Sequence, residues 1–239
     1  MTHPPRAEQL PLDLPADPAM GRADFLRAPS NALALSAIES PEGLPRGIAV
    51  LTGPAGSGKT HLAQIWAERA GALRQPLASL ARDLPRLIAP SGPRAIALDD
   101  ADRLAGDRAQ EEALFHLLNH LRGQGQILLT SGRPVRDWGL ALPDLVSRLT
   151  AATHLTLAEP DEALLAAVLV KLFADRQLTV DPSLIDYLLG RMERSLGAAR
   201  RLVADLDARS IARKRPVTRD LARSVLAQTL DIEDRDAPS

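Results

Sequence analysis

Short apolar runs alternate with longer stretches of helical spacing through the first two thirds of the chain. Four of these runs have the length and composition of buried parallel strands, at residues 47–52, 94–98, 126–130 and 154–157. Apolar residues recur at helical spacing before and between them, at 31–40, 59–71, 80–88 and 108–122. Because strands that alternate with helices pair into a parallel sheet covered on both faces, we predict an α/β fold.

The strand pattern ends near Glu159, and only helical spacing follows. Apolar pairs repeat from Leu164 to Phe173 and again from Leu184 to Met192, and two more helices fit 197–213 and 218–230. Before the first helix, the many prolines and the weak periodicity indicate a flexible leader. We therefore predict a leader at 1–24, an α/β domain at 25–159 and a small all-α lid domain at 160–239.

Composition indicates a globular protein and excludes several kinds of site. Hydrophobic residues make up 45% of the chain and charged residues 25%, which is typical of a globular protein. The absence of cysteine excludes disulfides and thiolate metal sites and suits a reducing compartment. The N-terminus has no apolar run long enough for a signal peptide or a spanning helix. We therefore predict a cytoplasmic protein with no membrane partner.

A glycine-rich turn, GPAGSGKT, separates the first predicted strand from the helix at 59–71 and matches the phosphate-binding loop G-x-x-x-x-G-K-[ST]. Its glycines let backbone N–H groups face phosphate oxygens at the positive end of the following helix. Lys59 is predicted to contact the β- and γ-phosphates, and the Thr60 hydroxyl to ligate Mg²⁺. The cofactors expected here are ADP or ATP with Mg²⁺. The predicted nucleotide-binding residues of this segment are Gly53, Pro54, Ala55, Gly56, Ser57, Gly58, Lys59, Thr60 and His61.

Two acids follow the strand at 94–98. Asp99 is predicted to hold the metal, and Asp100 to polarise an attacking water. Acids at a strand end can also cap a helix. Downstream of a phosphate-binding loop, we favour the metal and catalytic interpretation.

Two further residues are candidates for contacting a γ-phosphate, either of the chain's own nucleotide or of a neighbour's. The strand at 126–130 runs into Ser131, which is predicted to act as a sensor and to bind nucleotide, although Thr-Ser-Gly is also common turn chemistry. Arg148 lies in a Ser-Arg-Leu sequence ahead of the last strand. As a catalytic residue it would stabilise transition-state charge on a neighbour's nucleotide. Taken alone, Arg148 is more simply a surface arginine.

The order of these motifs resembles the AAA+ ATPases, and within them the DnaA-related family of bacterial replication initiators and Hda-type regulators. The resemblance covers about residues 22–230. Phe25 to Asn31 is similar to the segment that packs near adenine. The family's lid arginine that contacts nucleotide corresponds to Arg200 by apolar spacing, whereas alignment through Leu206-Asp207 places Gly197 there. At position 132 this chain has glycine, where initiators of the family often carry an acidic residue.

The leader carries a peptide, QLPLDL, that resembles the Q-L-x-L-x-L motif by which bacterial replication proteins bind the sliding clamp. The resemblance implies that Gln9, Leu10, Leu12 and Leu14 contact the clamp. Extended, proline-bearing peptides lose less entropy when they dock. The alternative is an apolar leader that packs on its own domain.

The resemblance implies a function in replication control. Initiators continue into a DNA-binding domain, whereas this chain ends at Ser239, shortly after its last predicted helix. We therefore expect an Hda-type inactivator that binds the sliding clamp (the β subunit of DNA polymerase III), meets DNA indirectly through the clamp and promotes hydrolysis of ATP bound to DnaA, thereby preventing re-initiation. Its own ATPase activity is expected to be weak or absent, and a homo-oligomer is compatible with the resemblance. The alternatives are a helicase-loader-type AAA+ ATPase and a clamp-bound adaptor without effect on hydrolysis.

Overall fold

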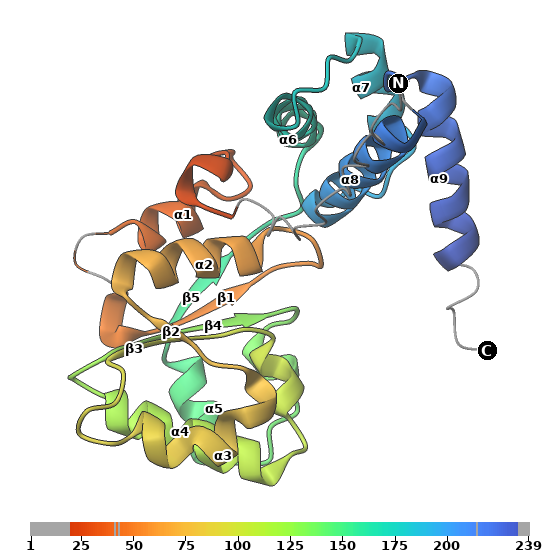
Figure 1. The fold of residues 1–239 in the computed structure, drawn as a ribbon. Coiled ribbons are helices and arrows are strands. Elements are labelled where there is room, and N and C mark those ends of the chain that lie inside the picture. Colours follow the sequence, from red (N-terminus) through yellow and green to blue (C-terminus); the bar gives the residue numbers. More distant parts are fainter. Residues whose placement is uncertain (1–19, 41, 43, 214, 234–239) are drawn as a thin grey trace, which may run out of the picture.

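A computed structural model describes residues 20–40, 42, 44–213 and 215–233. The leader residues Gln9, Leu10, Leu12 and Leu14 lie outside this part, so their predicted contact with a clamp remains a prediction. The described part contains a parallel sheet of five strands in the order β2-β3-β4-β1-β5 (Figure 1). The strands are β1 (Ile48–Thr52), β2 (Leu73–Arg74), β3 (Ala95–Leu98), β4 (Gln126–Ser131) and β5 (Thr153–Thr156).

Helices cover both faces of the sheet, so the predicted α/β fold is confirmed. Helices α1 and α2 lie on one face, and α3, α4 and α5 on the other (Figure 1). Their bounds are α1 (Ala32–Ile38), α2 (Lys59–Ala70), α3 (Leu80–Leu87), α4 (Arg108–Leu121) and α5 (Pro143–Thr150). Short 3₁₀ helices are η1 (Arg22–Asp24), η2 (Pro45–Gly47), η3 (Leu77–Ser79), η4 (Ala101–Leu104) and η5 (Val135–Asp137).

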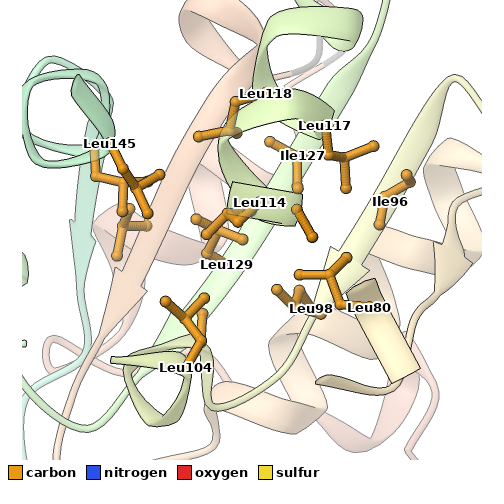
Figure 2. Close-up of a cluster of buried hydrophobic side chains, with 14 of the residues drawn as sticks. Leu80, Ile96, Leu98, Leu104, Leu114, Leu117, Leu118, Ile127, Leu129 and Leu145 are labelled. Carbon is orange, nitrogen blue, oxygen red and sulfur yellow. The ribbon is translucent and has the colours of Figure 1, made fainter. Parts of the chain in front are cut away.

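The central strands are buried on both sides, which explains their nearly continuous apolar sequences. In β1, Val50 faces α3, α4 and α5, while Ala49 and Leu51 face α1 and α2. Figure 2 shows the first of these clusters, in which leucines of α4 pack onto Ile127 and Leu129 of β4. The leucine and isoleucine side chains of this cluster fix the strand ends that carry the polar residues described below.

The remaining helices form a separate packed group with its own apolar cluster. They are α6 (Glu162–Asp175), α7 (Pro182–Leu189), α8 (Leu196–Arg213) and α9 (Arg219–Glu233). Asp181 caps α7 by accepting from the Ser183 backbone N–H at 2.8 Å, and Pro182 takes the first helical position. Leu26 and Ala28, from the segment before β1, also pack against this cluster. That segment therefore contacts the helical part as well as the sheet.

Within the described residues, no helix is both long and apolar enough to cross a membrane.

Candidate nucleotide site

The glycine-rich loop joins the end of β1 to the start of α2 and packs directly against the start of α8. Gly56 has φ +69° and Gly58 φ +101°, a region that side chains strongly disfavour. A Cβ atom on Gly56 would lie 2.4 Å from the Ser195 Cβ, and the Gly56 carbonyl accepts from the Leu196 N–H at 2.9 Å. The loop thus needs glycine both for its backbone turn and for its contact with the helical part.

Lys59 begins α2 and turns its ammonium back onto the loop. Its Nζ donates to the carbonyls of Gly53 and Pro54, each at 2.8 Å. Burial lowers the pKa of Lys59, and the negative charges of Asp100, Asp102 and Asp99 oppose that effect. The amine is therefore held at the loop with acids facing it from the end of β3.

A hollow of about 420 Å³ lies between the loop, the acids after β3 and the start of α8. Its size suits a small-molecule ligand. Of the residues predicted from sequence, it brings together Ala55, Gly56, Gly58, Lys59, Thr60, His61, Asp100 and Arg200. The remaining lining residues are Met20, Asp102, Arg103, Gly132, Leu196 and Gly197. Gly197 and Arg200, the two alternatives for the lid residue, both line it.

The two acids after β3 are placed differently. Asp100 lines the hollow, and its backbone N–H donates to the Thr130 hydroxyl at 3.0 Å. Asp99 does not line the hollow. Its carboxylate accepts from the Arg74 guanidinium at 2.6 Å and from the Thr130 hydroxyl at 2.9 Å. Ligation of Mg²⁺ by Thr60 and Asp99 remains a prediction.

Among the described residues, no three His, Cys, Asp or Glu side chains gather as a metal-binding cluster. Three residues with side-chain oxygen donors line the hollow: Thr60, Asp100 and Asp102.

The predicted sensor Ser131 lies at the end of β4 and is fully buried. Its hydroxyl donates to the Arg133 carbonyl at 2.6 Å and accepts from the Arg133 N–H at 3.1 Å, so it closes a turn. The structure does not bring Ser131 into the hollow. Gly132 lines the hollow instead, and Thr130 contacts both acids. Because strand side chains alternate between faces, a shift of one residue decides which hydroxyl meets the acids.

His61, in the first turn of α2, connects three parts of the chain. It is 2% exposed; its Nε2 contacts the Gly21 carbonyl at 3.0 Å, and its Nδ1 contacts Arg200 of α8 at 2.6 Å. A carbonyl can only accept and a guanidinium can only donate. The neutral ring with its proton on Nε2 is therefore the form that satisfies both contacts. Phe25 packs at right angles to the ring, with the centroids 5.1 Å apart.

This arrangement predicts a pH dependence of stability. Burial lowers the pKa of His61, an effect that the Gly21 carbonyl opposes and the Arg200 charge reinforces. The folded state then binds fewer protons than the unfolded state, so stability should be full above about pH 6.5 and fall as the pH drops below it. Urea unfolding at pH 7.5 and 5.5 measures the loss. His61→Gln should reduce it, since the amide can donate and accept without titrating.

The exposed His154 of β5, whose Nε2 contacts the Thr150 carbonyl at 3.2 Å, provides the control. His154→Gln should leave the pH dependence as in the wild type. An unchanged pH dependence in His61→Gln would contradict the assignment.

Arg148 lies at the other end of the sheet from the glycine-rich loop. Its guanidinium sits 5.3 Å from the centre of the Phe115 ring, within cation–π range. Arg148 lines a hollow of about 670 Å³ together with Arg46, Arg122 and Ile48, the first residue of β1. The glycine-rich loop follows Thr52, the last residue of that strand. The structure therefore separates Arg148 from the hollow that contains Lys59.

Comparison with solved structures places this arrangement among known folds. The chain resembles domain III of the replication initiation protein DnaA from Thermotoga maritima, with TM-score 0.78, 19% identity and coverage of 90% of this chain and 98% of that one. It has an AAA+ fold of the DnaA domain III type. No protein-family model matches the sequence.

Two further likenesses support the same fold. DnaA from Aquifex aeolicus bound to AMPPCP aligns with TM-score 0.66 at 21% identity, over 83% of this chain and 70% of that one. The RuvB Holliday junction branch migration motor of Thermotoga maritima aligns with TM-score 0.63 at 20% identity, over 82% and 65%. At such identities, the likeness concerns the fold.

Proposed function

We propose that this chain is an adenine-nucleotide-binding regulator of the Hda type, which binds the sliding clamp and promotes hydrolysis of ATP held by DnaA. The observation that carries the proposal is the separation of Arg148 from the chain's own phosphate-binding loop. Arg148 adjoins the start of β1, and the loop follows its end. An arginine so placed can serve a nucleotide only on another subunit.

The chain's own nucleotide would occupy the hollow beside the glycine-rich loop. Lys59 and Arg200 supply cations from the sheet part and the helical part, and the loop contributes backbone N–H groups at the start of α2. The related fold of Aquifex aeolicus DnaA binds AMPPCP, a nucleotide analogue. We assign ADP or ATP to this hollow. The nucleotide would hold the lid against the loop, with Asp100 facing its phosphates.

The surface around Arg148 suits a partner's polyphosphate. Arg46 and Arg122 add two cations to the same hollow, while Asp144 is the acid among its lining residues. Stacking on Phe115 restricts the guanidinium before any partner binds. A pre-positioned arginine loses less conformational entropy on binding. Because fingers of this kind stabilise charge that develops on the γ-phosphate, the proposed role is stimulation of hydrolysis in trans.

Clamp binding is assigned to the leader peptide at residues 9–14, on its sequence. Tethering to a clamp raises the local concentration of two proteins that contact each other weakly. The protein would then act where clamps encircle DNA, and DNA itself would be met through the clamp.

The decisive experiment measures hydrolysis of ATP pre-bound to DnaA, with and without this protein and DNA-loaded clamp. We expect fast hydrolysis only when both are present, and a return to the basal rate when Gln9, Leu12 and Leu14 are together replaced by Ala. ADP binding by that variant should be unchanged, which serves as its folding control. Clamp binding without any effect on the rate would instead indicate an adaptor. ATP turnover by this chain alone, stimulated by single-stranded DNA and independent of clamp, would indicate a helicase-loader-type ATPase.

A further inference from the structure

Asp99 directly follows β3, in the position expected for a metal ligand, and both oxygens of its carboxylate accept from protein groups. One oxygen accepts from the Arg74 guanidinium at 2.6 Å, and the other accepts from the buried Thr130 hydroxyl at 2.9 Å. The side chains of Arg74 and Asp99 are 43% and 28% exposed, so the pair is partly accessible to solvent. The carboxylate is thus neutralised by a cation of the same chain.

Two features hold Arg74 in this place. Strand β2 pairs with β3 in parallel register, with Arg74 opposite Ala97, so its side chain starts near the end of β3. Its second terminal nitrogen, Nη1, donates to the Gln64 side-chain oxygen of α2 at 2.9 Å, and Gln64 in turn donates to Glu68 at 2.7 Å. The guanidinium is therefore oriented from two sides, toward Asp99 and toward α2.

A guanidinium and Mg²⁺ compete for the same carboxylate. Magnesium requires near-octahedral oxygen ligands and relies on the charge of one or two carboxylates, so a neutralised carboxylate is a poor ligand. Two cations at one carboxylate also repel each other. Magnesium must therefore displace Arg74 from Asp99, or bind through the other groups that face the hollow.

We propose that Arg74 is a positioning residue that acts as an internal counter-ion of Asp99, so that this site binds adenine nucleotide with little dependence on Mg²⁺. The inference rests on the proposed nucleotide binding and deepens it. A nucleotide held by protein cations without a metal ligand from β3 acts as a structural element of the fold. Such a site also fits weak intrinsic hydrolysis, because the Asp99 carboxylate is paired with Arg74.

The test compares ADP dissociation constants of the full chain, measured by calorimetry in Mg²⁺ and in EDTA. For the wild type, the two constants should agree within about threefold, because Asp99 is already neutralised. Arg74→Met keeps the aliphatic stem and removes the charge. In that variant, affinity should fall in EDTA, where the Asp99 charge repels phosphate, and recover in Mg²⁺, giving a ratio of about tenfold or more.

Arg82→Ala is the matched control, since the Arg82 side chain is 79% exposed and pairs with Asp83. It should keep the wild-type ratio. Gln64→Ala, which loosens Arg74 without removing it, should give an intermediate ratio, and thermal melting confirms that each variant is folded. Two results would overturn the role of Arg74 but leave the proposed nucleotide site standing. One is a wild type that needs Mg²⁺ for tight ADP binding. The other is an Arg74→Met variant with the same ratio of dissociation constants in EDTA and Mg²⁺ as the wild type. A wild type that binds no ADP in either buffer would overturn the proposed nucleotide site, and this inference with it.

Discussion

Arg148→Ala is expected to abolish most of the stimulation of DnaA-bound ATP hydrolysis while leaving ADP and clamp binding intact. Arginines supplied in trans change NTPase rates by roughly 10³ to 10⁵, and a regulatory pair with a modest maximal rate should still lose at least about tenfold. The loss follows because the guanidinium is the group that meets charge spreading over the γ-phosphate oxygens. Single-turnover hydrolysis of ATP pre-loaded on DnaA, with DNA-loaded clamp, measures it.

Three further variants test whether the loss is specific to the guanidinium of Arg148. Arg148→Lys should restore little, since an ammonium cannot reproduce the planar fork of donors. Phe115→Leu should give an intermediate rate, because the ring lies within cation–π range of Arg148 and helps to orient it. Arg136→Ala, at a side chain 82% exposed and paired with Asp137, should behave as the wild type. Full stimulation by Arg148→Ala would make it a surface arginine and shift the catalytic help to another group, or to reshaping of the initiator's own site.

The architecture was readable from sequence because its main elements are long or strongly patterned. Each of the four predicted strands appears within two residues of its expected bounds, since a strand buried on both faces needs a continuous apolar run. The glycine-rich loop was readable for a different reason: its backbone turn and its contact with Ser195 admit only glycine at Gly56. In both cases a local structural requirement restricts the residue types, and the restriction is visible in the sequence.

Strand β2 and helix α5 escaped prediction for different reasons. Strand β2 has two residues, and α5 has eight, starting at a proline in a segment read only for its Ser-Arg pair. A two-residue strand shows no alternation, so its existence depends on the neighbour that pairs with it. The contact of Arg74 with Asp99 follows from β2, and no spacing along the chain indicates it.

The side-chain directions at the site also lie beyond sequence reasoning. Thr130 and Ser131 are adjacent hydroxyl residues, and the choice between them depends on which one faces the acids in the folded sheet. Asp100 has φ +51°, a conformation uncommon for residues other than glycine, which sets its direction apart from that of Asp99. Such placements come from tertiary packing, which a single sequence does not display.

Lys59→Ala is expected to weaken ADP binding by about 10- to 100-fold. A hydrogen bond to a charged group contributes roughly 1.5–3 kcal/mol, and each 1.4 kcal/mol is tenfold in affinity. The ammonium donates to the carbonyls of Gly53 and Pro54. These two bonds hold the ammonium beside the loop, where the predicted phosphates would lie. Calorimetry with ADP measures the constants directly.

The nucleotide-free stability of Lys59→Ala separates affinity from folding. Removing the amine loses two bonds to carbonyls but also relieves the cost of burial that lowers its pKa, so these effects oppose each other. We expect a small change in melting temperature without ligand and a much smaller upward shift with ADP than in the wild type. Arg108→Ala, at an exposed residue paired with Glu112 on α4, should keep the wild-type shift. If Lys59→Ala retained wild-type affinity, the backbone N–H groups of the loop and Arg200 would have to hold the phosphates without it.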